Sequence, residues 1–164
     1  MYPRIFLSLA ALTFLVVGCA STPDAPIKPR AKPAGAGLAL GDPKVSVAPG
    51  TTCSPDLALG IASRFKSAAS GALSKAGFHV VDETAGGAAP YGAGLEIEVS
   101  YCSDAGIVSG STALELKKGG ASVWRSQATG DQARPETAAS TMAELVDNML
   151  DDPSVATMFA AAKL

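Results

Sequence analysis

The chain has 164 residues, of which 48% are hydrophobic, 17% charged and 5% aromatic, and its net charge is −2 at neutral pH. This length and balance exclude a large multidomain enzyme, a chain that is disordered throughout, and nucleic-acid binding through bulk positive charge. The expected organisation is one domain preceded by a tail.

Residues 1–18 have the pattern of an export signal. One basic residue, Arg4, precedes the apolar segment 5–17. This segment has the length of a signal-peptide core and is too short for a membrane-spanning helix, which needs about 20 apolar residues. We therefore expect export from the cytoplasm.

The signal ends in Val16-Val17-Gly18-Cys19, which resembles the lipobox of bacterial lipoproteins. The resemblance implies that Cys19 receives a diacylglyceryl group, becomes the first residue of the mature protein and is acylated again on its amine, for example with palmitate. Because Ala20 rather than Asp follows, it also implies a lipid anchor on the periplasmic face of the outer membrane of a Gram-negative cell. The alternative is an ordinary secretory signal with an incidental cysteine.

Residues 19–43 are expected to form a disordered tether rich in Pro, Ala and Gly. Three of its prolines follow the three-residue period of polyproline II, namely Pro23, Pro26 and Pro29. The extended tether would reach about 60–70 Å and would hold the domain away from the lipid surface. Its basic residues either bind anionic lipid or cell-wall carboxylates or only keep the tether solvated: Lys28, Arg30 and Lys32.

Residues 44–164 are expected to form a periplasmic domain. Alternating apolar residues predict strands over 44–48, 78–82, 95–102, 112–116 and 122–130. Ser54-Pro55-Asp56 is a strong helix start and Gly77 a suitable helix end, while Pro135 opens a second long helix and Pro153 a short terminal one. The order β-α-β-β-β-α, with 122–130 counted as a fifth strand after the Gly119-Gly120 turn, predicts an α+β two-layer sandwich. Its antiparallel-dominated sheet would have four to five strands, with two long helices on one face.

Two cysteines, Cys53 and Cys102, remain once Cys19 is assigned to lipid. In an oxidising compartment they are expected to form one disulfide, which would contribute about 4 kcal/mol through loop entropy. Simple alternation places Cys102 on the solvent face of its strand, so the bridge requires a twist or bulge near Tyr101. The alternative is a pair of buried free thiols.

Residues with catalytic or metal-binding chemistry are scarce. The single histidine, His79, has no partner at the spacing of a triad or zinc site, and nucleotide-binding and hydrolase motifs are missing from the sequence. We expect no cofactor and no metal. Glu96 and Glu98 lie two apart on one strand and resemble an acid–base pair, but a solvated face balanced by Lys117 is the simpler interpretation.

Trp124 is the residue singled out for partner contact. A two-residue turn at Gly119-Gly120 would place Trp124 beside Glu115 on the open face of the sheet, where an exposed Trp is typical of a binding hot spot. The expected binding surface comprises Trp124, Glu96, Glu98, Glu115 and Lys117. The alternative is that a bulge turns Trp124 into the core.

Three segments resemble small periplasmic domains: S-K-A-G-F-H-V-V-D at 74–82, V-W-R-S-Q-A-T-G at 123–130, and the Met- and Leu-rich C-terminal helix. Together they resemble the TolB N-terminal, CsgG-type and LpoB-type α+β domains. The resemblance implies a domain that binds other envelope components and is not an enzyme.

We therefore expect a non-catalytic, lipid-anchored adaptor or assembly factor that binds an envelope protein, with no nucleic-acid partner and no small-molecule substrate. The first alternative is a structural lipoprotein that binds peptidoglycan through its basic tether. The second is a small hydrolase that uses Glu96 and Glu98.

Overall fold

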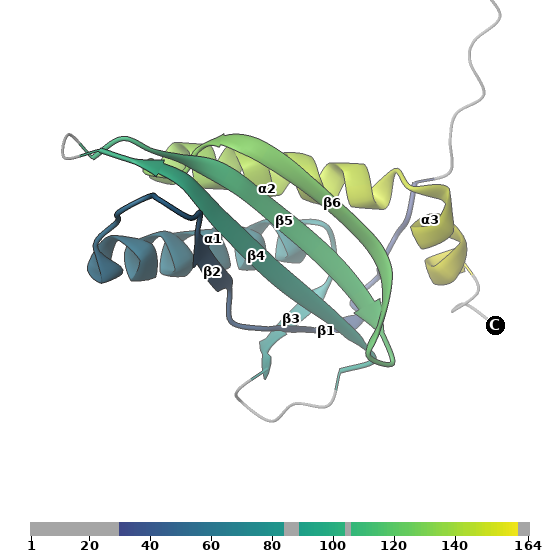
Figure 1. The fold of residues 1–164 in the computed structure, drawn as a ribbon. Coiled ribbons are helices and arrows are strands. Elements are labelled where there is room, and N and C mark those ends of the chain that lie inside the picture. The colour runs from purple at the N-terminus through teal and green to yellow at the C-terminus, as the bar shows by residue number, and fades with distance from the viewer. Residues whose placement is uncertain (1–29, 84–88, 104–105, 161–164) are drawn as a thin grey trace, which may run out of the picture.

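The structure, a computed structural model, describes residues 30–83, 89–103 and 106–160. A twisted six-stranded sheet carries two long helices on one face (Figure 1), as the α+β two-layer prediction requires. The strands are β1 (Gly37–Leu40), β2 (Lys44–Val47), β3 (His79–Asp82), β4 (Tyr91–Cys102), β5 (Val108–Lys118) and β6 (Ala121–Asp131). The helices are α1 (Pro55–Lys75), α2 (Pro135–Leu150) and α3 (Pro153–Ala160).

Three long antiparallel strands, β4, β5 and β6, make up most of the sheet. The short strands form parallel pairs: β1 pairs with the start of β4 and with β3, and β2 pairs with the second half of β4. The sheet is therefore antiparallel over most of its area, as expected, but it has one strand more than the highest predicted number.

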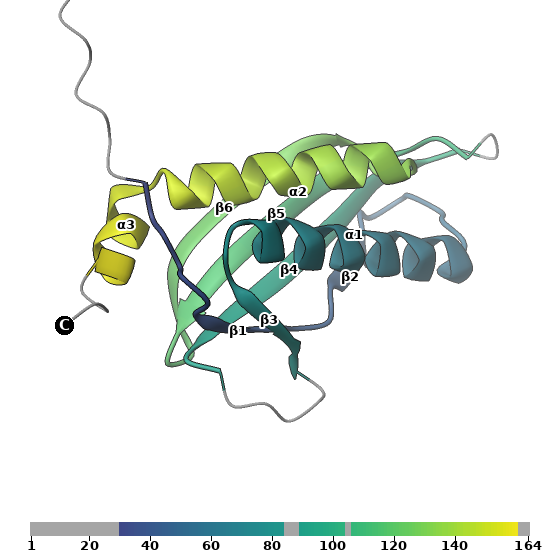
Figure 2. The same ribbon diagram turned by 180° about the vertical axis from the view of Figure 1, so that it is seen from behind.

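The helices begin where the sequence predicts. The Ser54 hydroxyl accepts a hydrogen bond from the Leu57 amide at 3.2 Å, Pro55 occupies the first turn, and Gly77 follows the helix with φ +101°. Both long helices lie across the same face of the sheet (Figure 2). Their buried stripes are Ile61, Phe65, Ala69 and Leu73 in α1, and Ala138, Met142, Leu145, Val146, Met149 and Leu150 in α2.

Part of the segment assigned to the tether is packed into this domain. Strand β1 belongs to the segment predicted as tether, and its side chains Leu38 and Leu40 are almost completely buried in the domain. The Ala31 amide donates to the Leu150 carbonyl at 2.7 Å, so the packed chain begins near residue 31 rather than 44. The sequence analysis did not predict this four-residue strand, because Leu38 and Leu40 are the only large apolar residues in its alternating pattern.

Two irregularities in the strand register change which side chains face the helices. The first lies between Val99 and Tyr101 of β4; beyond it Tyr101 is 52% exposed, although simple alternation had placed it inside. The second lies between Leu116 and Lys117 of β5, where Leu116 pairs with Trp124 and Lys117 with Ser122. Val123 is the extra residue of this bulge.

No helix within the described ranges is long and apolar enough to cross a bilayer.

The first bulge leaves no space at Gly110 for a side chain. A Cβ there would lie 3.0 Å from the Glu98 carbonyl carbon and 3.1 Å from the Val99 Cα. Because both neighbours are backbone, we expect Gly110→Ala to lower the free energy of unfolding by about 2–4 kcal/mol. Chemical denaturation measures this change.

Gly130 provides the matched control, since it pairs with Gly110 across the ladder and a Cβ there would meet nothing within 4 Å. Gly130→Ala should change stability by no more than about 0.5 kcal/mol. Equal losses for the two variants would contradict the close backbone approach.

Candidate functional site

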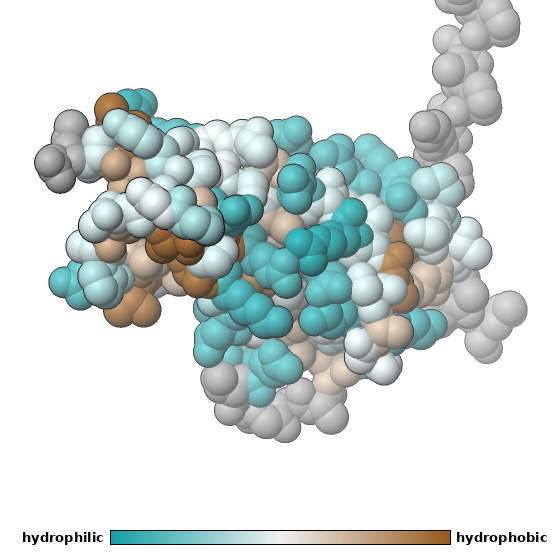
Figure 3. Space-filling model, viewed as in Figure 1, coloured by the Kyte–Doolittle hydropathy of each residue, from teal (hydrophilic) through white to brown (hydrophobic). Residues whose placement is uncertain are grey.

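The face of strands β4–β6 that points away from the helices is here called the outer face. In the described part of the chain no helix covers it, and it carries a band of charged and polar side chains (Figure 3). The register places four of the predicted binding residues on this face, Glu96, Glu98, Glu115 and Lys117, together with Arg125, Gln127 and Thr129.

The charges on the outer face pair with one another. Arg125 Nη2 donates to Glu96 Oε2 at 2.7 Å, and Lys117 Nζ lies 3.0 Å from Glu115 Oε2. Lys117 was expected to balance Glu96 and Glu98, but it pairs with Glu115, and Arg125 pairs with Glu96. Surface pairs of this kind contribute little stability, about 0–1 kcal/mol each.

Glu115 is the most sheltered carboxylate of the band, with 18% of its side chain exposed. Hydrogen bonds from Lys117 and then Ser122 hold the pKa of its carboxyl below the usual value of 4.5. A lowered pKa favours the folded state while the carboxyl is ionised. This contribution is therefore present above about pH 4.5 and is lost as the pH falls through the lowered value.

Glu96 and Glu98 line two different hollows of the outer face. The first hollow has a volume of about 130 Å³ and its walls include Glu96, Glu115 and Lys117. The second has a volume of about 430 Å³ and is lined by Glu98, serine and threonine hydroxyls, Gln127 and glycines. A shared acid–base site would need both carboxylates to face one space, so this geometry does not favour the hydrolase hypothesis.

For Trp124 the structure matches the alternative, in which a bulge turns the side chain toward the core, and not the placement on the open face. The bulge at Val123 pairs Trp124 with Leu116, whose side chain is fully buried, and the indole packs against the core on the helix side. Trp124 is half-buried rather than presented to a partner. Arg125, which sequence reasoning did not consider, occupies the outer face instead.

Cys53 and Cys102 are joined by a disulfide bond, with their Cα atoms 5.7 Å apart, an ordinary separation for a bridge. The bulge at Tyr101 turns Cys102 toward the core, against which both cysteines pack. The disulfide ties the segment before α1 to the end of β4, at the opposite end of the domain from α3 (Figure 1).

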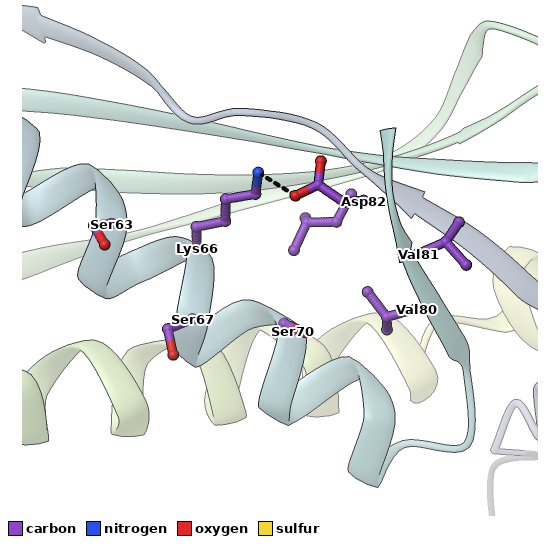
Figure 4. A pocket seen from close by; sticks show the side chains of 8 residues that line it. Ser63, Lys66, Ser67, Ser70, Val80, Val81 and Asp82 are labelled. Atoms are coloured by element: carbon purple, nitrogen blue, oxygen red, sulfur yellow. Dashed lines mark hydrogen bonds and ion pairs between the residues drawn. The ribbon is translucent and has the colours of Figure 1, made fainter. Parts of the chain in front are cut away.

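A groove of about 380 Å³ lies between α1 and β3 (Figure 4). Lys66 crosses it and donates to Asp42 Oδ1 at 2.6 Å and to Asp82 Oδ2 at 2.9 Å. Serines of α1 line one side of the groove, and apolar residues of β1 and β3 line the other. The hydrogen bonds from Lys66 to Asp42 and Asp82 raise the pKa of its ammonium group. Lys66 therefore stays charged and acts as a cross-link between α1 and the sheet rather than as a nucleophile.

Other candidate residues are dispersed. His79 is exposed on β3, and no three His, Cys, Asp or Glu side chains of the described residues are grouped to hold a metal ion. Arg30, one of the three basic tether residues, pairs with Asp147 of α2 and with Asp151, the residue that follows this helix. Cys19 and Lys28 lie outside the described residues, so the lipid anchor stays a prediction.

Searches with the sequence find no matching family model and no matching curated protein, so they give no support to the TolB, CsgG and LpoB-type resemblance. Among solved structures, the PelC dodecamer from Paraburkholderia phytofirmans is similar at 19% identity, over 71% of this chain and 90% of that chain, with a TM-score of 0.46.

Two further structures are similar at 12% identity. Protein XCC0632 from Xanthomonas campestris, of family DUF330, matches over 85% of this chain and 94% of its own with a TM-score of 0.49. Lipoprotein GNA1162 from Neisseria meningitidis matches over 71% of this chain and 99% of its own, with a TM-score of 0.44. These identities are too low to transfer a function to this chain.

The disulfide closes a loop between residues 49 positions apart in the sequence. Replacing Cys53 and Cys102 together by Ser should lower the free energy of unfolding by about 4 kcal/mol, because the unfolded chain then regains the entropy of the open loop. Denaturation of oxidised protein and of the double variant measures the difference. If native protein reacts with two equivalents of an alkylating agent at these positions, the bridge does not form.

Proposed function

We propose that this protein is a non-catalytic, lipid-anchored module of the bacterial cell envelope that binds another envelope protein through the outer face of strands β4–β6. The observation that carries the proposal is that both long helices cover one face of the sheet and leave the other open. An antiparallel sheet tolerates one solvated face, and here that face spans the three long strands β4, β5 and β6.

The charge arrangement supports recognition rather than chemistry. Acidic and basic groups pair over the three strands, with Glu96 of β4 reaching Arg125 of β6 and Glu115 beside Lys117 within β5. Paired charges of opposite sign give a surface an orientation-specific pattern, which selects partners and docking angles more than it adds affinity. Glu98 and the hydroxyl-lined hollow beside it extend this pattern along the same face.

The anchor is the second part of the proposal. The segment 5–17 followed by Gly18-Cys19 supports acylation of Cys19, with the domain on the periplasmic face of the outer membrane. A diacylglyceryl group together with an amide-linked chain holds a protein stably on a bilayer, whereas a single chain does not.

Cys19→Ser tests the anchor. The variant should incorporate no fatty-acid analogue and should accumulate as uncleaved precursor, because the acceptor thiol and the processing site are both lost. Labelling of cells and gel migration of the precursor measure the two effects. Equal incorporation by wild-type and variant protein would contradict the lipobox interpretation.

Arg125→Glu tests the binding surface. A photo-crosslinking residue is placed at Gln127, which is exposed on the outer face, and a second at Glu144, which is exposed on α2. We expect a discrete adduct at position 127 and none at 144. Arg125→Glu places a second acidic group beside Glu96 and should lower the yield of that adduct by about tenfold, which corresponds to about 1.4 kcal/mol.

Lys32→Glu is the matched charge reversal at an exposed residue outside the outer face. It should leave the adduct at position 127 unchanged. A loss of equal size with Lys32→Glu would mean that total charge, rather than the outer face, governs binding. Adducts of equal yield at positions 127 and 144 would place the partner elsewhere.

A further inference from the structure

An apolar groove lies between helix α3 and the turn that joins β5 to β6. It has a volume of about 490 Å³, and its lining residues are Lys118, Val123, Ser154, Val155, Thr157 and Met158. Figure 3 shows hydrophobic surface at this place, between the end of the sheet and α3. The bulge that moves Trp124 inward also exposes Val123, which is 38% accessible to solvent.

The hydroxyl groups of this lining are already used within α3. Ser154 Oγ donates to Asp152 Oδ1, and Thr157 Oγ1 donates to the Pro153 carbonyl at 2.8 Å. The groove therefore presents methyl and methylene groups to a ligand. Helix α3 itself contains no charged residue, whereas α1 and α2 contain several.

The chain enters the domain at the same end. Arg30 pairs with Asp147 and Asp151 at the end of α2, and Ala31 bonds to Leu150 immediately before α3. From Cys19 to Arg30 there are only eleven residue steps, which span at most about 40 Å when fully extended. The predicted tether is therefore shorter, because residues 31–43 belong to the packed domain.

We infer that the groove of α3 and the β5–β6 turn rests on the bilayer that holds the protein and takes up acyl chains of that leaflet. The inference depends on the proposed anchor at Cys19, which fixes this end of the domain near the membrane. Val123 and Met158 enter the acyl boundary to the depth of an interfacial helix, about 5–10 Å. Lys118 at the rim reaches back to lipid phosphates, as long basic side chains do at interfaces.

Photo-crosslinking from the lipid tests this contact. The mature acylated protein is reconstituted in vesicles of phosphatidylethanolamine and phosphatidylglycerol with a trace of phosphatidylcholine that carries a diazirine in its acyl chain. After irradiation, crosslinked peptides are identified by mass spectrometry. We expect adducts on the peptides that contain Val123 and Met158, and fewer on the peptide that contains Ile107, although Ile107 is 58% exposed at the other end of the domain.

Two variants test the groove itself. Val123→Ser combined with Met158→Ser should lower labelling of these peptides at least about threefold, because apolar contact area is lost. Thr157→Glu, at an exposed position of α3 that removes nothing from the core, should have the same effect by placing a charge at the acyl boundary. Val47→Ser, at an exposed position of β2, is the matched control and should leave labelling unchanged.

The experiments distinguish a failure of the proposed anchor at Cys19 from a failure of the proposed contact between the groove and the bilayer. Mass analysis of the N-terminal peptide and flotation with vesicles test acylation of Cys19. If Cys19 is not acylated, its thiol is coupled to a maleimide phospholipid, which restores the tether, and the labelling is repeated. Labelling at Ile107 equal to that at Val123, or labelling insensitive to Thr157→Glu, overturns the bilayer contact. Labelling that appears only after deletion of residues 161–164 also overturns it, since the chain's own C-terminal segment would then occupy the groove.

Discussion

The alternation of side chains along β4 is the constraint on which the rest of the structure depends. Strands β1, β2 and β5 pair with β4 directly, and β3 and β6 join the sheet through β1 and β5. Leu95, Ile97 and Val99 of β4 are almost completely buried beneath the helices, while Glu96 and Glu98 between them point outward. A shift of one residue would exchange these two sets and place carboxylates in the core. The division into a covered and an open face is therefore fixed by one strand.

The two bulges are the places where a strict alternation of inward and outward side chains no longer predicts which face a residue occupies. Without the bulge at Val123, Arg125 and Gln127 would share the buried face with Leu116. The actual register buries Trp124, Ser126 and Ala128 more deeply and leaves Arg125 and Gln127 in solvent. The sequence alone could have predicted this bulge by a comparison of the free energies of burying either set of side chains. Burial of the unpaired guanidinium of Arg125 is far more costly than burial of the indole of Trp124.

The ends of helix α1 could be predicted from the local sequence alone. Ser54, Pro55 and Gly77 locate α1 because each satisfies a local backbone requirement at a helix end, independently of tertiary contacts. Strand β1 could not be recognised in the same way, since Leu38 and Leu40 are its only large residues and its pairing with β3 and β4 depends on distant segments. For the outer face, strand alternation located Glu96, Glu98, Glu115 and Lys117. The ion pair of Glu96 with Arg125, which spans from β4 to β6, depends on cross-strand register, which local alternation does not fix.

The shorter tether changes the relation between anchor and domain. A spacer of 60–70 Å would let the domain tumble freely above the lipid, whereas the proposed anchor, only eleven residues before Arg30, would hold the end of the molecule that contains α3 closer to the lipid. With the proposed anchor at Cys19, the disulfide end of the sheet would point away from the membrane, because α3 and the end of β4, where Cys102 lies, are at opposite ends of the domain (Figure 1). The strands of the outer face run between these two ends. A partner bound there would therefore lie beside the domain rather than above it, within reach of the same membrane surface.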